Sequence, residues 1–264
     1  MSKAFIFDNE GTVRFTEARQ RFLAGFLARL KQQFELDTAM DVGCGVGDFC
    51  AFLRDFGFRV SALDGRRDNV EEAQRRVESV KFYVANVEDP TLSSLGSFDL
   101  VLCVGLLYHL ENPFRAIRNL FALTGKVLIV ESRCTPEESS TLHLVDEAKL
   151  EDQGLDYVAF YPSEGCLIKM LFRSGFPYVY TFRSLPDHEQ FRGTPDRKRS
   201  RTMLVASRMQ LNEPELNLAT EPGNTHDFWL LRWPAFKLRA LNFLKRPWKD
   251  KMQAIRHLPP RIRT

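Results

Sequence analysis

Residues 37–49 read Asp-Thr-Ala-Met-Asp-Val-Gly-Cys-Gly-Val-Gly-Asp-Phe, a short apolar run that leads into three alternating glycines. The pattern predicts a strand, a tight loop and a helix in succession. Gly43, Gly45 and Gly47 have no Cβ, so the loop can turn sharply and bring its backbone close to a ligand at the helix start. Dinucleotide-binding loops usually have G-x-G-x-x-G, whereas here the spacing is G-x-G-x-G with Asp41 two residues earlier. Taken alone, the loop is also compatible with tight strand-to-helix packing and no ligand.

Alternating strand and helix patterns continue on both sides of this loop. Apolar residues at helical spacing predict a helix over 16–34, whereas residues 1–12 have no regular pattern. Further strands are predicted at 38–42, 58–64, 80–85, 97–104 and 126–130, with helices at 47–56, 67–78 and 113–123. Such alternation favours an α/β fold with a parallel sheet, helices on both faces and ligands at the carboxyl ends of the strands.

The second half of the chain departs from this regular order. Residues 132–160 are loosely patterned and too long for an ordinary connection, so they are a candidate substrate lid. A helix over 162–174 and two antiparallel strands over 175–183 and 201–207 are predicted next. The domain is therefore expected to span 1–208, followed by a polar linker at 209–227 and a basic, aromatic tail at 228–264.

Composition limits the classes of protein to consider. The 264 residues are 44% hydrophobic with a net charge of only +3, which indicates a folded, soluble protein and not a polyelectrolyte. Five scattered cysteines without metal-ligand spacing favour reduced thiols. The N-terminus has too short an apolar run for a secretory signal, and no window is long enough to span a membrane, so a cytoplasmic location is expected.

The ordered motifs together resemble the class I S-adenosylmethionine-dependent methyltransferases, over residues 16–208. Asp41 to Gly47 is similar to the family's first motif, Asp64 to its second-strand acid, Asn86-Val87 to its third-strand loop, and residues 103–109 to the segment after its fourth strand. The resemblance implies a Rossmann-like, seven-stranded, mostly parallel sheet with an antiparallel last strand. It also implies S-adenosyl-L-methionine as cofactor, with the glycine loop along its methionine part, Asp64 on the ribose hydroxyls and the third loop beside the adenine. The implied cofactor-binding residues are Asp41, Gly43, Cys44, Gly45, Gly47, Asp64, Gly65, Asn86, Val87, Cys103 and Val104.

Methyl transfer to a hydroxyl requires alignment of the acceptor and removal of one proton. His109 is the candidate catalytic base, because it follows the fourth strand at the carboxyl edge and imidazole titrates near neutrality. A histidine there could instead only fix the loop through a backbone hydrogen bond. Tyr108 is a weaker candidate and is expected to form a wall. Cys103, in a buried strand, and Cys44, among the glycines, are expected to pack as small residues.

Some chemistries lack their motifs in this sequence. The Asp-Pro-Pro-Tyr or Asn-Pro-Pro-Tyr segment of base-amino methyltransferases is absent from 104–107, and no Pro-Cys pair offers a pyrimidine-C5 nucleophile. The other four histidines have no mutual spacing typical of a metal site, so no metal is expected.

Three functions remain open. The segment Leu107-Tyr-His-Leu-Glu-Asn-Pro113 resembles methyltransferases that act on sugars and other small hydroxylated metabolites, which favours O-methylation of a small-molecule or glycan acceptor. It is more distantly similar to an enzyme that modifies the tRNA wobble uridine. For RNA, or for an anionic membrane surface, residues 228–264 offer aromatic and basic side chains, although these could instead pack on the domain. A non-catalytic, cofactor-binding partner subunit is the third alternative.

Overall fold

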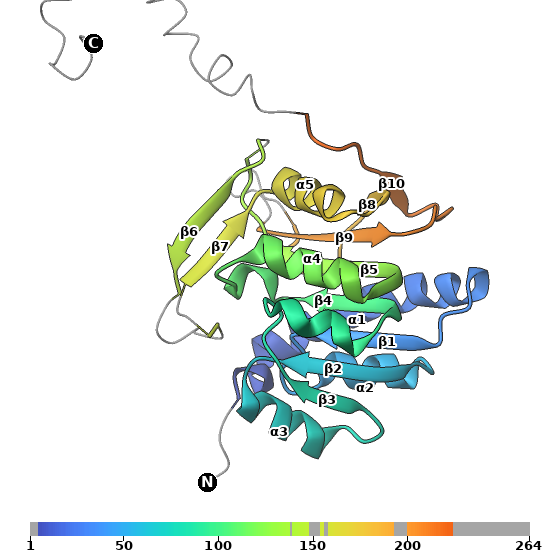
Figure 1. Cartoon of the computed structure of the whole chain (residues 1–264), viewed down its shortest axis with the longest axis vertical. Coiled ribbons are helices and arrows are strands. Elements are labelled where there is room, and N and C mark those ends of the chain that lie inside the picture. The colour runs from blue at the N-terminus through green and yellow to red at the C-terminus, as the bar shows by residue number, and fades with distance from the viewer. Residues whose placement is uncertain (1–4, 138, 148–153, 156–157, 193–199, 224–264) are drawn as a thin grey trace, which may run out of the picture. The chain divides into compact units, whose positions relative to one another are not determined.

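A twisted central sheet organises the chain in a computed structural model that describes residues 5–137, 139–147, 154–155, 158–192 and 200–223 (Figure 1). Among these residues, eight strands form the sheet in the order β10-β8-β9-β5-β4-β1-β2-β3. The strands are β1 Thr38–Val42, β2 Arg59–Asp64, β3 Lys81–Val84, β4 Phe98–Val104, β5 Thr124–Arg133, β8 Tyr178–Phe182, β9 Arg201–Ser207 and β10 Leu216–Leu218.

The first five strands run parallel, and the antiparallel pairs lie at one end of the sheet. Strand β1 is central, since Asp41 aligns with Ala62 of β2 and with Leu102 of β4. Strand β9 pairs antiparallel with both β5 and β8, and β10 pairs antiparallel with β8. The Rossmann-like, mostly parallel α/β fold is therefore confirmed. The sheet of the described residues has eight strands and not the predicted seven, because β10 pairs with the edge of β8.

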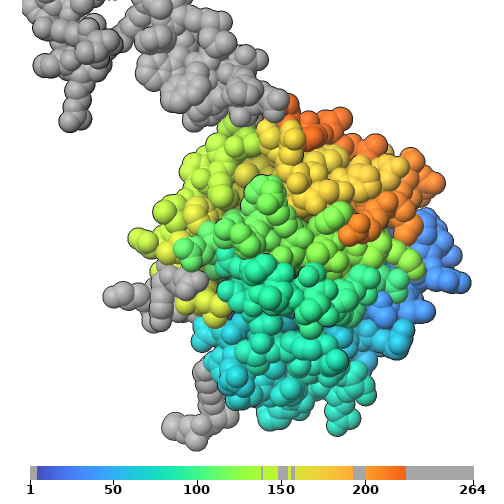
Figure 2. Space-filling view, in the orientation of Figure 1, coloured from blue at the N-terminus to red at the C-terminus, as the bar shows by residue number. Residues whose placement is uncertain are grey.

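Helices cover both faces of the sheet. They are η1 Ile6–Asp8, α1 Glu10–Gln33, α2 Asp48–Asp55, α3 Arg67–Arg76, η2 Pro90–Leu95, η3 Leu107–His109, α4 Pro113–Leu123 and α5 Glu164–Ser174. Because successive strand residues point to opposite faces, Leu102 and Ile129 pack with the buried side chains of α1 and α2. Their neighbours Val101 and Leu128 pack with those of α4 and α5, which cover the face turned to the viewer in Figure 2.

The amino-terminal segment is more ordered than its sequence indicates. Residues 1–12 have no apolar periodicity, yet α1 begins at Glu10, and η1 precedes it. The reason is a cap: the Asn9 side chain accepts a hydrogen bond from the Thr12 N–H at 2.8 Å. An exposed first turn contributes no apolar pattern, so periodicity alone misses it.

The segment predicted as a lid, 132–160, contains regular structure. Strand β5 continues to Arg133, and a two-stranded antiparallel hairpin follows, formed by β6 Leu142–Asp146 and β7 Val158–Pro162. The hairpin stands at the left of Figure 1, where β4 and β5 end, and β7 contacts η3. The parts of this segment at 138, 148–153 and 156–157 lie outside the described residues.

The prediction of a linker at 209–227 is wrong for part of its described length, because residues 216–218 form strand β10. Its backbone pairing with β8 supplies order that the polar composition of this segment does not reveal. Residues up to Pro222 belong to one compact unit. The predicted tail at 228–264 lies outside the described residues. None of the described helices has the length and apolarity needed to cross a bilayer.

Candidate functional site

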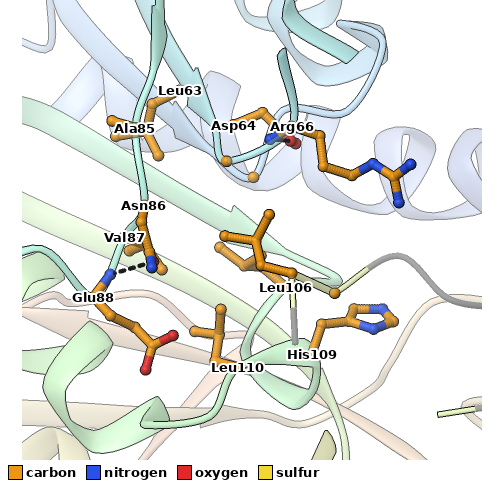
Figure 3. Close-up of a pocket in the computed structure, with 14 residues that line it drawn as sticks. Leu63, Asp64, Arg66, Ala85, Asn86, Val87, Glu88, Leu106, His109 and Leu110 are labelled. Carbon is orange, nitrogen blue, oxygen red and sulfur yellow. Dashed lines mark hydrogen bonds between the residues drawn. The ribbon is translucent and has the colours of Figure 1, made fainter. Parts of the chain in front are cut away.

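A pocket of about 470 Å³ opens where β1, β2 and β3 end (Figure 3). Asp64 and Arg66 form its upper side in the figure, and Asn86, Val87 and Glu88 lie along its left side. Leu106, His109 and Leu110 close it from below. Gly43 and Gly65 also line it, as do Gly154 and Leu155 from the segment predicted as a lid. The structure thus brings six of the sequence-predicted residues together here: Gly43, Asp64, Gly65, Asn86, Val87 and His109.

Asp64 holds the glycine loop against the end of β2. Its Oδ2 accepts a hydrogen bond from the Gly45 N–H at 3.0 Å, and its Oδ1 accepts from the Arg66 N–H at 2.8 Å and from Asn69 Nδ2 at 3.2 Å. Burial raises the pKa of this carboxyl, while the N–H donors of Arg66 and Gly45 oppose the rise. Asp64 therefore couples the loop, the second strand and the start of α3.

Two of the loop glycines are required by their surroundings. Gly45 has φ +53°, and a Cβ there would lie 2.7 Å from the Phe7 ring of η1. Gly47, at φ +97°, is the N-cap residue of α2, and a Cβ there would lie 3.0 Å from Val77 and 3.3 Å from Ala73. The loop is therefore packed between η1 on one side and the α3 segment on the other.

Four of the sequence-predicted cofactor residues lie behind this surface and line neither this pocket nor the second one described below: Asp41, Cys44, Gly47 and Cys103. Gly45 also lines neither pocket, because Phe7 covers it. Asp41 is buried beneath the loop, where it accepts a hydrogen bond from Cys50 Sγ at 3.2 Å and where burial raises its pKa to about 7. Cys103 is buried inside β4, and burial raises the pKa of its thiol. Their direct contact with a cofactor stays a prediction.

The loop after β3 is fixed from two directions. Asn86 Oδ1 accepts a hydrogen bond from the Glu88 N–H at 2.9 Å, and the Val87 carbonyl accepts one from Asn119 Nδ2 of α4 at 2.7 Å. Glu88 in turn accepts a hydrogen bond from the Asn112 N–H at the start of α4. This loop is therefore held in place by its own side chain and by α4.

His109 ends η3 and lines both pockets. Its Nδ1 contacts the Glu147 carboxylate, and the two side chains are only 10% and 6% exposed. Its Nε2 is buried and has no hydrogen-bond partner among the described residues. A carboxylate on one ring nitrogen fixes the imidazole and leaves the other nitrogen to act on a proton. No sequence motif identifies Glu147, which lies in the irregular segment 38 positions from His109.

A second, larger pocket of about 1510 Å³ lies on the other side of Leu106 and shares Gly43, Asp64, Leu106 and His109 with the first. Val104, the remaining sequence-predicted cofactor residue, lines only this one. Its wall carries Tyr108, Tyr161 of β7, and three arginines: Arg19 of α1, Arg133 of β5 and Arg201 of β9.

Two of these arginines share one buried carboxylate. Glu131 is fully buried and accepts hydrogen bonds from Arg201 Nη1 at 2.9 Å and from Arg19 Nη1 at 3.2 Å. Arg201 Nη2 also donates to the Tyr108 hydroxyl at 3.1 Å. Burial lowers the pKa of Arg19, against the attraction of Glu131, and the like charge of Arg201 lowers it further. Sequence reasoning missed this network, because its members lie on four separate elements.

The two pockets thus offer different chemistry on either side of one histidine. The first is lined mostly by glycines and apolar side chains with the carboxylates of Asp64 and Glu88, whereas the second carries tyrosines and three arginines beside its acidic residues. His109 stands where they meet. No group of three side chains suited to hold a metal ion occurs within the described ranges.

The sequence of this chain is similar to those of known proteins. A family described as "Methyltransferase domain" matches residues 15–179. A ubiquinone biosynthesis O-methyltransferase from Xanthomonas axonopodis pv. citri is 34% identical over 104 residues, which cover 37% of this chain and 44% of that protein. The same enzyme from Rickettsia typhi is 33% identical over 85 residues, 31% of this chain and 34% of that protein. The matching part therefore spans less than half the length of these curated relatives.

Solved structures show the same fold. The N-terminal domain of EvdMO1, with S-adenosylhomocysteine bound, has a TM-score of 0.54 at 21% identity, covering 68% of this chain and 79% of that one. Magnesium protoporphyrin IX methyltransferase from Synechocystis, with S-adenosylmethionine bound, has a TM-score of 0.52 at 20% identity, covering 79% of this chain and 87% of that one.

Proposed function

This chain belongs to the class I S-adenosylmethionine-dependent methyltransferase family, and from that premise we propose that it methylates a hydroxyl oxygen of a small-molecule or glycan acceptor, with His109 as the base. The observation that carries the proposal is the buried His109 Nε2, without a partner among the described residues, where the two pockets meet. The ubiquinone relatives are O-methyltransferases by name, which supports oxygen as the acceptor atom.

The first pocket is the proposed cofactor site. Its lining joins Asp64 at the end of β2 to Asn86 and Val87 after β3. Gly43 and Gly65 keep two of its walls open, since a Cβ on either would lie 2.9 Å from a leucine side chain. Asp64 would hold the ribose hydroxyls, while Asn86 and Val87 would flank the adenine. When bound, S-adenosylmethionine supplies an electrophilic methyl group on a sulfonium.

The remaining chemistry is the work of this chain's side chains. Glu147 at Nδ1 orients the His109 imidazole. Nε2 then takes the proton of the acceptor hydroxyl as the oxygen becomes nucleophilic. The described wall of Tyr108 and Tyr161 in the second pocket limits the water around the acceptor.

The alternatives of an RNA or an anionic-membrane partner rest on residues 228–264, outside the described part of the chain, and they stay predictions. The second pocket, by contrast, lies within described residues and is large enough for a small hydroxylated molecule.

The test is transfer of a labelled methyl group from S-adenosylmethionine to a panel of hydroxylated small molecules and glycans, with mass spectrometry to locate the methyl on oxygen. His109→Ala should lower kcat by about 10²- to 10⁴-fold, the range of a lost general base. Because His109 also lines the first pocket, the affinity for S-adenosylhomocysteine should change as well, but by far less than kcat. His143→Ala is the matched control, because that histidine is half exposed on β6 beside Glu137 and should leave turnover unchanged. Full turnover by His109→Ala would exclude the histidine as base, and a methyl group found on nitrogen or carbon would contradict O-methylation.

A further inference from the structure

Arg133 stands at the end of β5 with its guanidinium between two aromatic rings. Its Cζ lies 5.4 Å from the centroid of Tyr108 and 5.6 Å from that of Tyr161. Its Nη1 donates a hydrogen bond to the Tyr161 hydroxyl at 2.8 Å. The rings hold the guanidinium in one place within the second pocket, and within the described ranges no carboxylate pairs with it.

The carboxylates around this pocket contact other groups or form no ion pair with Arg133 among the described residues. Glu131 serves Arg19 and Arg201 together. Asp64 binds the glycine loop, and Glu147 contacts His109. Asp146, the other acid of the lining, is exposed on β6, and no ion pair joins it to an arginine of the described chain.

Pairing around Glu131 leaves one arginine of this wall without an ion pair among the described residues. Two buried guanidiniums share the single charge of Glu131, whereas Arg133, half-buried at the end of β5, pairs with none of the lining acids. Arg19 Nε is also buried with no hydrogen-bond partner among the described residues. A partly desolvated guanidinium of this kind is stabilised when an anion pairs with it.

We infer that the acceptor carries a carboxylate or phosphate group, and that Arg133 binds this group. A guanidinium presents paired N–H donors that match the oxygens of either anion. Tyr108 stands between the two ends of such a molecule, since its ring centroid is 4.1 Å from that of His109 and 5.4 Å from Arg133 Cζ. The acid group would thus bind Arg133 on one side of the Tyr108 ring, and the reacting hydroxyl would face His109 on the other side. A compact hydroxy acid or a phosphorylated sugar carries both groups. This inference rests on the proposed function, because it assigns the second pocket to the acceptor.

The experiment is calorimetry on the full chain saturated with S-adenosylhomocysteine, with inorganic phosphate and benzoate as anionic probes and benzyl alcohol as the neutral probe. Saturation keeps the cofactor's own carboxylate in place, so that the probes report on the acceptor side. At least one anion should bind with a Kd in the millimolar range, and benzyl alcohol more weakly. Arg133→Gln should weaken the anion by about 10-fold or more, as expected for a lost charged hydrogen bond. Arg133→Lys should retain part of the affinity, because it keeps the charge.

Arg118→Gln is the matched control, because that exposed arginine also lies over an aromatic ring, with its Cζ 4.6 Å from the centroid of Phe114. It should leave anion binding unchanged. Preference for phosphate would identify phosphate esters as the acceptor class, and preference for benzoate would identify carboxylic acids; either supports the inference. Absence of anion binding, or equal binding by Arg133→Gln, would overturn it. Failure to bind S-adenosylhomocysteine in the first place would instead contradict the proposed function.

Discussion

The proposed cofactor side and the proposed acceptor side of the site are built in different ways. The first pocket is formed by consecutive strand ends, and backbone N–H groups, glycines, apolar side chains and two carboxylates shape it. The second pocket is formed by long side chains from α1, η3, β5, β7 and β9, held by a charge network around Glu131. One side depends on loop conformation, and the other depends on distant side chains that meet only in the folded chain.

The two arrangements suit different kinds of ligand. A pocket lined by backbone suits one constant ligand, because side-chain substitutions elsewhere in the chain leave its lining unchanged. A wall of paired side chains can be altered residue by residue, which suits recognition of an acceptor. If a substitution in one pocket leaves the other pocket unchanged, the two pockets are built independently. If it changes both, this distinction between the pockets is wrong.

The largest effect is expected at the carboxylate of the acceptor side. Glu131→Gln removes the charge that two buried guanidiniums share, and breaking a buried pair costs roughly 3–5 kcal/mol of folding free energy. Urea denaturation measures this loss. Glu72→Gln is the control, because its pairs with Arg75 and Arg76 lie at the surface of α3 and should contribute little. Similar losses for both variants would show that the acceptor wall is not held by its buried charge.

A smaller effect is expected on the cofactor side. Asp64→Asn weakens three hydrogen bonds, one from the Gly45 N–H of the glycine loop and two from Arg66 and Asn69 at the start of α3. The affinity for S-adenosylhomocysteine should fall by about 10- to 100-fold, corresponding to about 1.5–3 kcal/mol, with little change in anion binding by Arg133. Calorimetry measures both. Asp55→Asn, at the exposed end of α2, should leave the affinity unchanged, and an unaltered affinity in Asp64→Asn would contradict its role.

The last prediction concerns the pH dependence that Asp41 contributes beneath the loop, and its change in stability per pH unit is smaller than either loss above. Burial raises its pKa to about 7, whereas an unfolded aspartate titrates near 4. Between about pH 4 and pH 7 the folded chain keeps a proton that the unfolded chain loses, so stability falls by about 1.4 kcal/mol per pH unit as pH rises. Asp41→Asn should remove this slope in urea denaturation at several pH values. A slope unchanged by the substitution would show that Asp41 is ionised in the folded chain.

The cofactor side was largely predictable from sequence, and the acceptor side was not. Gly43, Asp64 and Asn86 lie at or just after the ends of three strands, so strand periodicity places them at one edge. His109 was found for the same reason. Gly45 and Gly47, predicted with Gly43, line neither pocket. Arg19 and Arg201 look like ordinary charged residues in the sequence, since only the folded sheet brings them to Glu131. Glu147 and Tyr161 belong to the hairpin region, and strand β10 forms only because β8 offers it a hydrogen-bonding edge.

Strand β10 also determines where the chain can be shortened. The family match ends at residue 179, inside β8. The described residues that line the first and second pockets all precede residue 202. A recombinant fragment that stopped at 208 would keep the described lining of both pockets and lose β10. The free N–H and C=O groups of β8 would then recruit strands from other molecules, because an uncovered sheet edge is a template for aggregation. A soluble preparation should therefore extend beyond Leu218.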